Sequence, residues 1–460
     1  MDSEKCKPFV KSGADDEKHD DNAFNVECKT YKKRWLILAL FCMCSACNAS
    51  HWIQYAIITN IVSRYYNVDS VLVDWTSIIF MATYIPLVFP ASWVLQKKGL
   101  RVAVIMGAVL LAIGSWIKVF SAHRDRFDVA FTGQTIVSIS QMFTLGAPAR
   151  LAAVWFPHHQ VSSATAIGVF GNQIGIAIGF LIPPMIVQES NDNHQIGKQF
   201  HMLYLGTAIA STVIFLLILM LFEAAPACPP SIAQKLAVIK KNRADEKSFY
   251  TSLKHLICNF DFDLLLTSYG FNIGAFYAYS TLLNQLITAH FPMGNEFAGR
   301  VGLTLIIGGV LGSLLWGIVL DKTQIYKGTT VLIYCLSTLG MAAFTYTLQQ
   351  EWQAMVYVTS AFLGFFMNGY LTVGYEFGAE LTYPESEATS SGLLNASGEL
   401  CGVIAVLVAE IILKRFSALA TNISLVIMLL IGLFLCLFID GKKLKRLEAS
   451  QQPDRSNSVL

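Results

Sequence analysis

The run VAVIMGAVLLAIGSWIKVFS, residues 102–121, decides the class of protein to which this chain belongs. Lys118 is the single charged residue in it, and about twenty apolar residues are what an α-helix needs to cross a bilayer. Comparable runs recur along the chain, in which 54% of residues are hydrophobic and 14% are charged, against about 25% charged in soluble domains. The sequence therefore predicts an all-α membrane protein.

Twelve such runs predict twelve transmembrane helices, at 35–62, 75–95, 102–121, 129–154, 160–185, 202–222, 263–290, 299–320, 328–348, 354–380, 388–413 and 418–440. The longest polar connection, 223–262, divides them into two sets of six. We expect an N-terminal tail (1–34), an N-terminal six-helix bundle (35–222), the linker (223–262), a C-terminal six-helix bundle (263–441) and a C-terminal tail (442–460). This is the layout of the major facilitator fold, in which two bundles rock about a site at the bilayer midplane.

The distribution of Lys and Arg indicates the orientation of the chain. Cytoplasmic loops of membrane proteins are enriched in these residues. Basic clusters lie before the first span, after the second, in the linker and after the last, at 32–34, 97–101, 235–247 and 442–446. We therefore expect both tails in the cytosol. The expected membrane is the plasma membrane, which these charges do not themselves specify.

Two similar loops point to an internal duplication. SWVLQKKGLR (92–101) follows the second span, and GIVLDKTQIYK (317–327) follows the eighth. The second loop resembles the loop signature of major facilitators through Asp321 and Lys322, charges that in that superfamily hold helix ends together on the cytosolic side in one state. The first has Gln96 where the acid should be. An ordinary basic loop beside a membrane is the alternative.

Three further charges lie at predicted cytosolic helix ends. Glu376 and Glu380 are one helical turn apart in span ten, and Arg150 lies in GAPARLAAVWF of span four. We expect these charges to pair across the halves as a gate when the cytosolic side closes. Solvated helix ends with no such role are the alternative.

Polar residues within the first span form a candidate site. Asn48, His51, Trp52 and Tyr55 share one face of a helix, because residues three, four and seven apart are neighbours. Lipid would leave their polar groups unpaired, so this face must meet protein or a water-filled cavity. Substrate binding and plain helix packing both satisfy that requirement.

Span five reads FGNQIGIAIGFLIPP, with Gly171, Gly175 and Gly179 at every fourth position. Such a face lets another helix approach closely. Gln173 lies on a different face, so it is free to line a cavity or to make an interhelical hydrogen bond.

Spans seven and eleven contribute the remaining candidates for substrate binding. Tyr277 and Asn284 share a face of span seven, and Asn395 and Glu399 are one turn apart in span eleven. A carboxylate at mid-membrane costs about 2.5 to 3.5 kcal/mol on insertion scales unless it is protonated or paired. Glu399 is therefore either a binding residue or a neutral acid hydrogen bonded within the bundle.

Several function classes are excluded by what the sequence lacks. It contains no metal-ligand cluster, nucleophile elbow or phosphate loop, so we expect no enzyme, no cofactor and no metal site. A net charge of +2 gives no indication of nucleic-acid binding. The expected partners are a small-molecule substrate and the lipid bilayer, and the expected state is a monomer.

The runs NASHWIQYAIITN, GAPARLAAVWF, YGFNIGAFYAYSTLLN and YEFGAELTYPESEATSSGLLNASGE resemble the feline leukaemia virus subgroup C receptor family of major facilitators. The resemblance covers residues 31–440. It implies facilitated transport of choline and ethanolamine, and haem export is the alternative activity. It also implies that Trp52, Gln173 and Tyr277 contact the substrate. Glu399 stands where the family has Gln, and Ser50 and His51 stand where it usually has Phe and Gln.

The physics of the substrate agrees with this implication. A trimethylammonium group has no hydrogen-bond donor, whereas aromatic faces attract it by about 2 kcal/mol or more each once water is excluded. Haem would favour His51 as a ligand and would need Lys or Arg near its propionates, which the spans scarcely provide. The sequence therefore favours an aromatic cage for an ammonium group.

Overall fold

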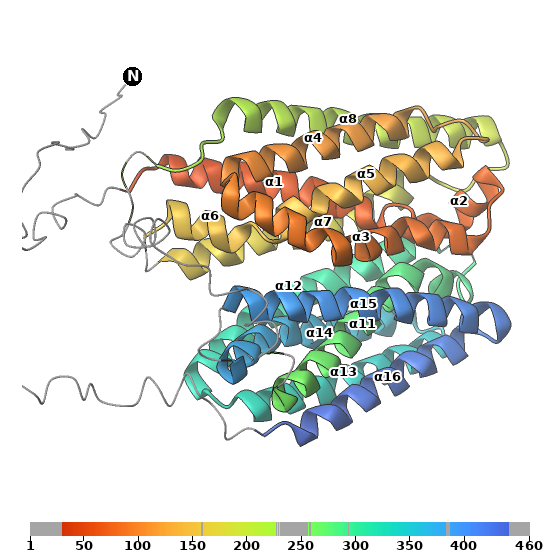
Figure 1. Cartoon of the computed structure of the whole chain (residues 1–460). Helices are drawn as coiled ribbons and strands as arrows, with labels where there is room; N and C mark the ends of the chain where they lie inside the picture. Colours follow the sequence, from red (N-terminus) through yellow and green to blue (C-terminus); the bar gives the residue numbers. More distant parts are fainter. Residues whose placement is uncertain are drawn as a thin grey trace, which may run out of the picture.

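A computed structural model describes residues 30–157, 160–226, 228, 230, 256, 259–292, 294–382 and 387–440. These residues form two helical bundles that lie against each other, one from each half of the chain (Figure 1). Residues 1–29 of the predicted N-terminal tail, most of the predicted linker and the whole predicted C-terminal tail lie outside the described residues.

The helices of the N-terminal half are α1 (Lys33–Ile53), η2 (Ala56–Ile58), α2 (Thr59–Tyr66), α3 (Ser70–Lys97), α4 (Leu100–Val119), α5 (Phe127–Leu145), α6 (Pro148–Trp155), α7 (Val161–Ile186) and α8 (Asn193–Leu221). Those of the C-terminal half are α11 (Phe260–Thr288), α12 (Asn295–Thr323), α13 (Tyr326–Gln349), α14 (Gln353–Thr382), α15 (Glu387–Arg415) and α16 (Ala418–Phe438). Counting α1 with α2, and α5 with α6, each half has six spans, which confirms the predicted fold class.

Within the described residues, ten helical segments are long and apolar enough to cross a membrane, and α1 to α2 counts as one of them. The other two spans are α5 with α6, and α11. Their sequences carry more polar residues, such as Gln134 in α5 and Asn272 in α11, both fully buried. These spans are therefore shielded from lipid by the rest of the bundle.

The first span is not the continuous helix that its sequence predicts. α1 ends at Ile53, and the chain passes through the short η2 before α2 begins at Thr59. Two carbonyl groups freed by this break accept hydrogen bonds from side chains: His51 from Gln134 Nε2 at 2.6 Å, and Trp52 from Ser77 Oγ at 2.8 Å. Irregular backbone inside a membrane requires such replacement partners.

The predicted span at 129–154 is also divided. α5 ends at Leu145 and α6 begins at Pro148, which occupies the first turn of the new helix. Proline has no N–H to continue the preceding helix, yet its fixed φ suits a helix start. The sequence therefore ends one helix and begins the next within three residues.

The glycine face of α7 packs closely on α1, as predicted. A Cβ atom added to Gly171 would lie 2.8 Å from Cys42 Cα, and one added to Gly179 would lie 2.7 Å from Ser50 O. One added to Gly175 would collide with the backbone of Ala46. The two helices are therefore in backbone contact at three successive positions, over about two turns.

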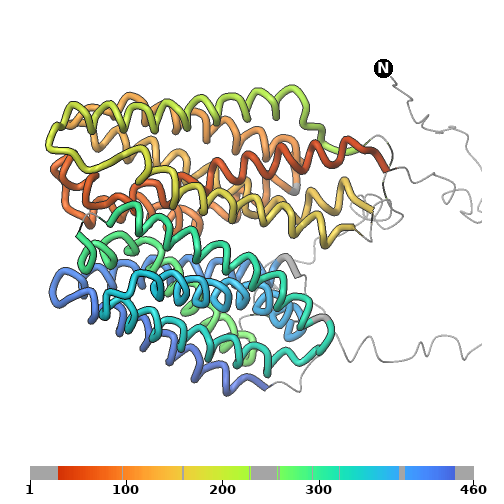
Figure 2. Tube along the Cα trace, turned by 180° about the vertical axis from the view of Figure 1, so that it is seen from behind, coloured from red at the N-terminus to blue at the C-terminus, as the bar shows by residue number. Residues whose placement is uncertain are grey.

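The two bundles meet most closely at one end. We call the end at which α1 begins and α16 ends the terminal end, and the opposite end the far end (Figure 2). Where both partners are described, every hydrogen bond and ion pair between the halves lies at the far end. There, a Cβ atom on Gly299 of α12 would also lie 2.8 Å from Pro184 of α7. The halves are thus closed at the far end.

Candidate functional site

Two aromatic rings from opposite halves meet near the middle of the bundle. Trp52, at the end of α1, and Tyr277, in α11, have ring centroids 5.3 Å apart and planes at 72°. Trp52 is 6% exposed and Tyr277 is half-buried. Trp52 is positioned by the bond from Ser77 to its carbonyl, so the break in the first span holds this ring in place.

A carboxyl group stands beside these rings. The Tyr277 hydroxyl donates to Glu399 Oε1 of α15 at 3.2 Å, and Glu399 is 4% exposed. One turn earlier on α15, Asn395 Oδ1 accepts a hydrogen bond from the Tyr375 hydroxyl at 2.5 Å. The structure therefore brings Trp52, Tyr277 and Glu399 together, with Asn395 next to them along the helix.

A glycine allows this approach. A Cβ atom on Gly402 of α15 would lie 2.6 Å from Tyr277 Cδ2 and 2.7 Å from Met81 Sδ of α3. Both distances are shorter than a real Cβ contact. Gly402 thus lets α15 pack against the Tyr277 ring and against the other half at the same point.

Gln173 is half-buried on α7, away from the glycine face. Its Oε1 is buried and has no hydrogen-bond partner among the described residues. It makes no hydrogen bond to Trp52 or Tyr277. The amide oxygen is therefore available to a polar ligand.

Three other residues of the predicted face lie inside the N-terminal bundle instead. Asn48 donates to Val137 O of α5 at 3.0 Å, and the ring of Tyr55 lies 6.0 Å from that of Tyr204 of α8. Asn48 and His51 are fully buried, and Tyr55 is 1% exposed. The packing alternative describes their contacts, and of the four residues Trp52 alone faces the other half.

His51 belongs to a buried polar hub that the sequence did not predict. Lys118 Nζ, fully buried in α4, lies 2.7 Å from His51 Nδ1, 2.6 Å from Gln54 Oε1 and 2.9 Å from Gln134 Oε1. It also stands 5.0 Å from the centre of the Tyr55 ring. Three acceptors match the three N–H donors of an ammonium group. The hub therefore joins α1, α4 and α5 beside the break in the first span.

The hub gives each ring nitrogen of His51 a polar neighbour. Nε2 lies 3.3 Å from Ser115 Oγ, and Nδ1 lies 2.7 Å from Lys118 Nζ and 3.0 Å from Gln54 Oε1. Both ring nitrogens are engaged.

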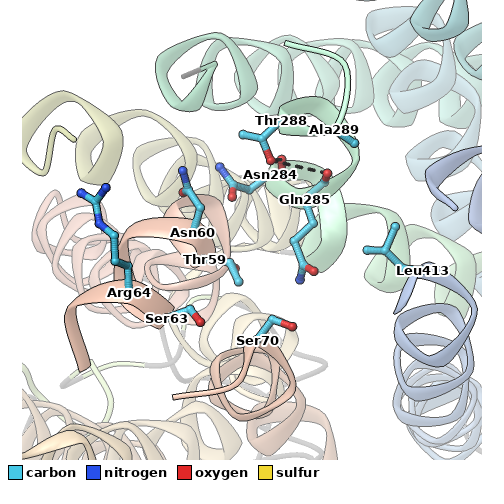
Figure 3. A pocket seen from close by; sticks show the side chains of 10 residues that line it. All are labelled: Thr59, Asn60, Ser63, Arg64, Ser70, Asn284, Gln285, Thr288, Ala289 and Leu413. Atoms are coloured by element: carbon cyan, nitrogen blue, oxygen red, sulfur yellow. Dashed lines mark hydrogen bonds between the residues drawn. The ribbon is translucent and has the colours of Figure 1, made fainter. Parts of the chain in front are cut away.

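A cavity of about 490 Å³ opens between the halves at the far end. Figure 3 shows polar side chains of α2 facing those of α11 across it. Asn284, predicted to lie in the substrate site with Tyr277, lines this cavity and donates to Asn295 Oδ1 at 2.6 Å. The cavity is thus separate from the Trp52–Tyr277 contact.

The sequence matches the family model described as Major Facilitator Superfamily over residues 36–333 and 265–458. It is 47% identical to "Choline/ethanolamine transporter flvcr2a" of Danio rerio, over 92% of this chain and 90% of that one. It is 40% identical to "Choline/ethanolamine transporter FLVCR2" of Homo sapiens, over 92% of this chain and 80% of that one.

This chain belongs to the feline leukaemia virus subgroup C receptor family of major facilitators. It is a multi-pass membrane transporter and not an enzyme. Among solved structures, a bacterial homologue of the human lysosomal transporter Spinster, in an inward-facing and unoccupied conformation, matches with a TM-score of 0.69 at 13% identity. It covers 91% of this chain and 99% of that one. At this identity the likeness shows the fold alone.

The predicted gate residues of this family member lie at the terminal end. Arg150 is exposed and forms no ion pair with Glu376 or Glu380, although all three residues are described. Glu380 is 4% exposed and accepts from the Tyr326 hydroxyl at 3.4 Å, whereas Glu376 is exposed. Lys322 is exposed, and the side chain of Asp321 lies outside the described part of the chain.

Sequence reasoning missed two acids of this family member, Asp74 and Glu410. Both are buried at the far end, at 0% and 2% exposure. Ionisable residues inside a span are the signal that would have found them, as it would have found the Lys118 hub. Asp74 lies one residue before the predicted start of span two, whereas Glu410 lies within predicted span eleven, near its end.

Proposed function

We propose that this chain transports choline and ethanolamine across the plasma membrane by alternating access, with the ammonium group held against Trp52 and Tyr277. The names of its relatives supply the substrate class. The contact between one ring from each half, with a buried carboxyl group beside it, is the observation that carries the proposal.

The geometry of the two rings suits a rounded cation. The rings now contact each other edge to face, with planes at 72°. Separation of the two halves would open a corner in which an ammonium group contacts one face of each ring. Each desolvated face contributes about 2 kcal/mol or more. The rings belong to different halves, so rocking of the halves changes the distance and angle between the rings. The affinity for the ammonium group changes with them.

Glu399 and Gln173 add polar contacts to this corner. Glu399 holds the Tyr277 hydroxyl and, when ionised, supplies a negative charge beside the cation. The free Oε1 of Gln173 is an acceptor for the hydroxyl that choline and ethanolamine share. Asn395 holds Tyr375 and so supports the α15 side of the site.

The basic clusters favour a cytosolic location for the terminal end. The far end is then extracellular, and its contacts between the halves close the outside. We infer that this conformation faces inward. In the outward-facing conformation, Arg150 is expected to pair with Glu376 or Glu380, and Asp321 and Lys322 to contribute to the same closure.

Haem export has weaker support. His51, the candidate haem ligand, is fully buried, and both of its ring nitrogens are engaged by Lys118 and Ser115. A metal ligand would need a free nitrogen facing the cavity.

Uptake of radiolabelled choline, ethanolamine and haem by cells expressing the chain tests the proposal. We expect saturable uptake of both amines and no haem transport above that of untransfected cells. Amine uptake no greater than background, in cells with the protein at their surface, would contradict the proposal.

A further inference from the structure

Two buried carboxyl groups face each other across the outer closure. Glu410 of α15 accepts from Ser70 Oγ of α3 at 2.8 Å through Oε1. Its other oxygen, Oε2, is buried and has no donor among the described residues. Asp74 lies one turn after Ser70 on the same face of α3, and both acids are buried, so the two carboxyl groups lie close together.

The donors around the pair leave one oxygen of the pair unmatched. Gln285 of α11 donates through Nε2 to both oxygens of Asp74, at 2.9 and 3.1 Å. Ser70 serves one oxygen of Glu410. Two buried carboxyl groups thus share this part of the closure and one of their oxygens, Oε2 of Glu410, has no donor, an arrangement that is unfavourable when both acids are ionised.

The nearby positive charge is shared. Lys414 Nζ lies 3.8 Å from Glu410 Oε1 and also donates to Asp69, an exposed acid that caps α3. The hydrogen bond from Lys414 lowers the pKa of Asp69, so Asp69 stays ionised and retains this lysine. Arg64 of α2 lines the cavity beside Ser70 but donates to Ser190 O.

We propose that Asp74 and Glu410 form a proton-binding site that holds the outer side of the transporter closed. Three acids, Asp69, Asp74 and Glu410, face one lysine, and a proton between the two buried carboxyl groups completes both the charge and the hydrogen bonding. The inference rests on the proposed alternating access, because the two acids lie on helices of different halves.

Opening of the outer side separates α3 from α15, and water then reaches each acid alone. The proton leaves to the extracellular side, since both acids are hydrated and ionised at neutral pH. The closed state thus binds one proton more than the open state. By linkage, the ratio of outward-open to outward-closed molecules rises by up to tenfold for each unit of external pH.

The rate at which a cysteine introduced at the outer closure is labelled reports the ratio of outward-open to outward-closed molecules. Thr59 lines the outer cavity and is 1% exposed, so Thr59→Cys is protected while the outside is closed. Asp125→Cys, in an outer loop where the Asp125 side chain is 86% exposed, is accessible in every state. Both variants are treated in intact cells with a membrane-impermeant maleimide between pH 5.5 and 8.5, with the parent chain as background. The ratio of their labelling rates removes the reagent's own pH dependence.

We expect the ratio to rise steeply with external pH. When both cysteine variants also carry Glu410→Gln, the ratio of labelling rates should stay low and should not change with pH. The amide still accepts from Ser70 and now donates to Asp74 without a titrating proton. Asp74→Asn should act in the same way, and it replaces Glu410→Gln if surface biotinylation finds that variant retained inside the cell. A ratio that is flat in the parent, or that rises equally in parent and variant, overturns the proposal. No substrate is present, so this outcome is distinct from a failure of amine uptake.

Discussion

Lys118 Nζ lies 2.7 Å from His51 Nδ1 in the closed interior of the N-terminal half, where Gln54 and Gln134 supply its other acceptors. An ammonium group buried among neutral acceptors is held by charge-assisted hydrogen bonds, which contribute about 1.5 to 3 kcal/mol each. The same Gln134 also binds the free carbonyl of His51. The hub therefore supports the break that positions Trp52.

Lys118→Met should lower the thermal unfolding midpoint of the detergent-solubilised protein, because it leaves three buried acceptors without a donor. Lys198→Met, at an exposed position of α8, is the matched control and should leave the midpoint unchanged. Equal midpoints for the two variants would show that the hub does not contribute to stability.

Trp52→Ala should lose most choline uptake, whereas Trp52→Phe should keep part of it. Loss of one desolvated cation–π face of about 2 kcal/mol corresponds to a loss of affinity of about thirtyfold. Trp93→Ala removes a tryptophan that is 55% exposed on α3 and should transport normally. Full uptake by Trp52→Ala would refute the aromatic site.

Glu399→Gln should weaken choline binding by about tenfold or more, because a neutral amide replaces a charge beside the cation. The amide oxygen still accepts from Tyr277, so the packing of the ring is preserved. Measured over a range of pH, binding to the variant should also vary less than binding to the parent. Unchanged affinity and an unchanged pH profile would assign Glu399 a structural role.

Gly402→Ala should raise the KM for choline, because the new methyl group forces Tyr277 or Met81 to move. Gly392→Ala is the control on the same helix, since a Cβ atom there has no neighbour within 4 Å. Both changes favour the helix equally in intrinsic propensity. A difference in KM between the two variants therefore reports the contact with Tyr277, and its absence would show that the site tolerates the displacement.

The fold follows from the length and number of apolar runs, because a bilayer permits few arrangements of such segments. Close approach of another helix to the glycine face of α7 was equally predictable, since glycine spacing is a local property of the sequence, but only the structure identifies that helix as α1. The break after Ile53 was not. Its replacement hydrogen bonds come from Gln134 and Ser77, residues distant in the sequence whose approach only tertiary structure reveals.

Some residues of the candidate site could be predicted from the sequence and others could not. The resemblance to the family pointed to Trp52 and Tyr277, and the structure places their rings in contact. Helical spacing assigned Asn48, His51 and Tyr55 to the same face as Trp52. Tyr55 lies beyond the end of the helix at Ile53, and Asn48 and His51 lie within α1 but find hydrogen-bond partners on α4 and α5, so all three pack within the N-terminal half. Asp74 and Glu410 are far apart in the sequence, and neither alone indicates that a second acid lies opposite.

The backbone contact of α7 with α1 affects the distances between the three proposed substrate contacts. It fixes the distance between Gln173 and Trp52, whereas the distance from either residue to Tyr277 can change. Helices that touch through Gly171, Gly175 and Gly179 travel as a single rigid piece, so the spacing of Gln173 from Trp52 is the same at every stage of a transport cycle. Tyr277 belongs to the C-terminal half and moves with it. In the proposed transport cycle, capture and release of the substrate would therefore depend on the motion of the Tyr277 ring relative to Trp52 and Gln173, whose spacing is constant.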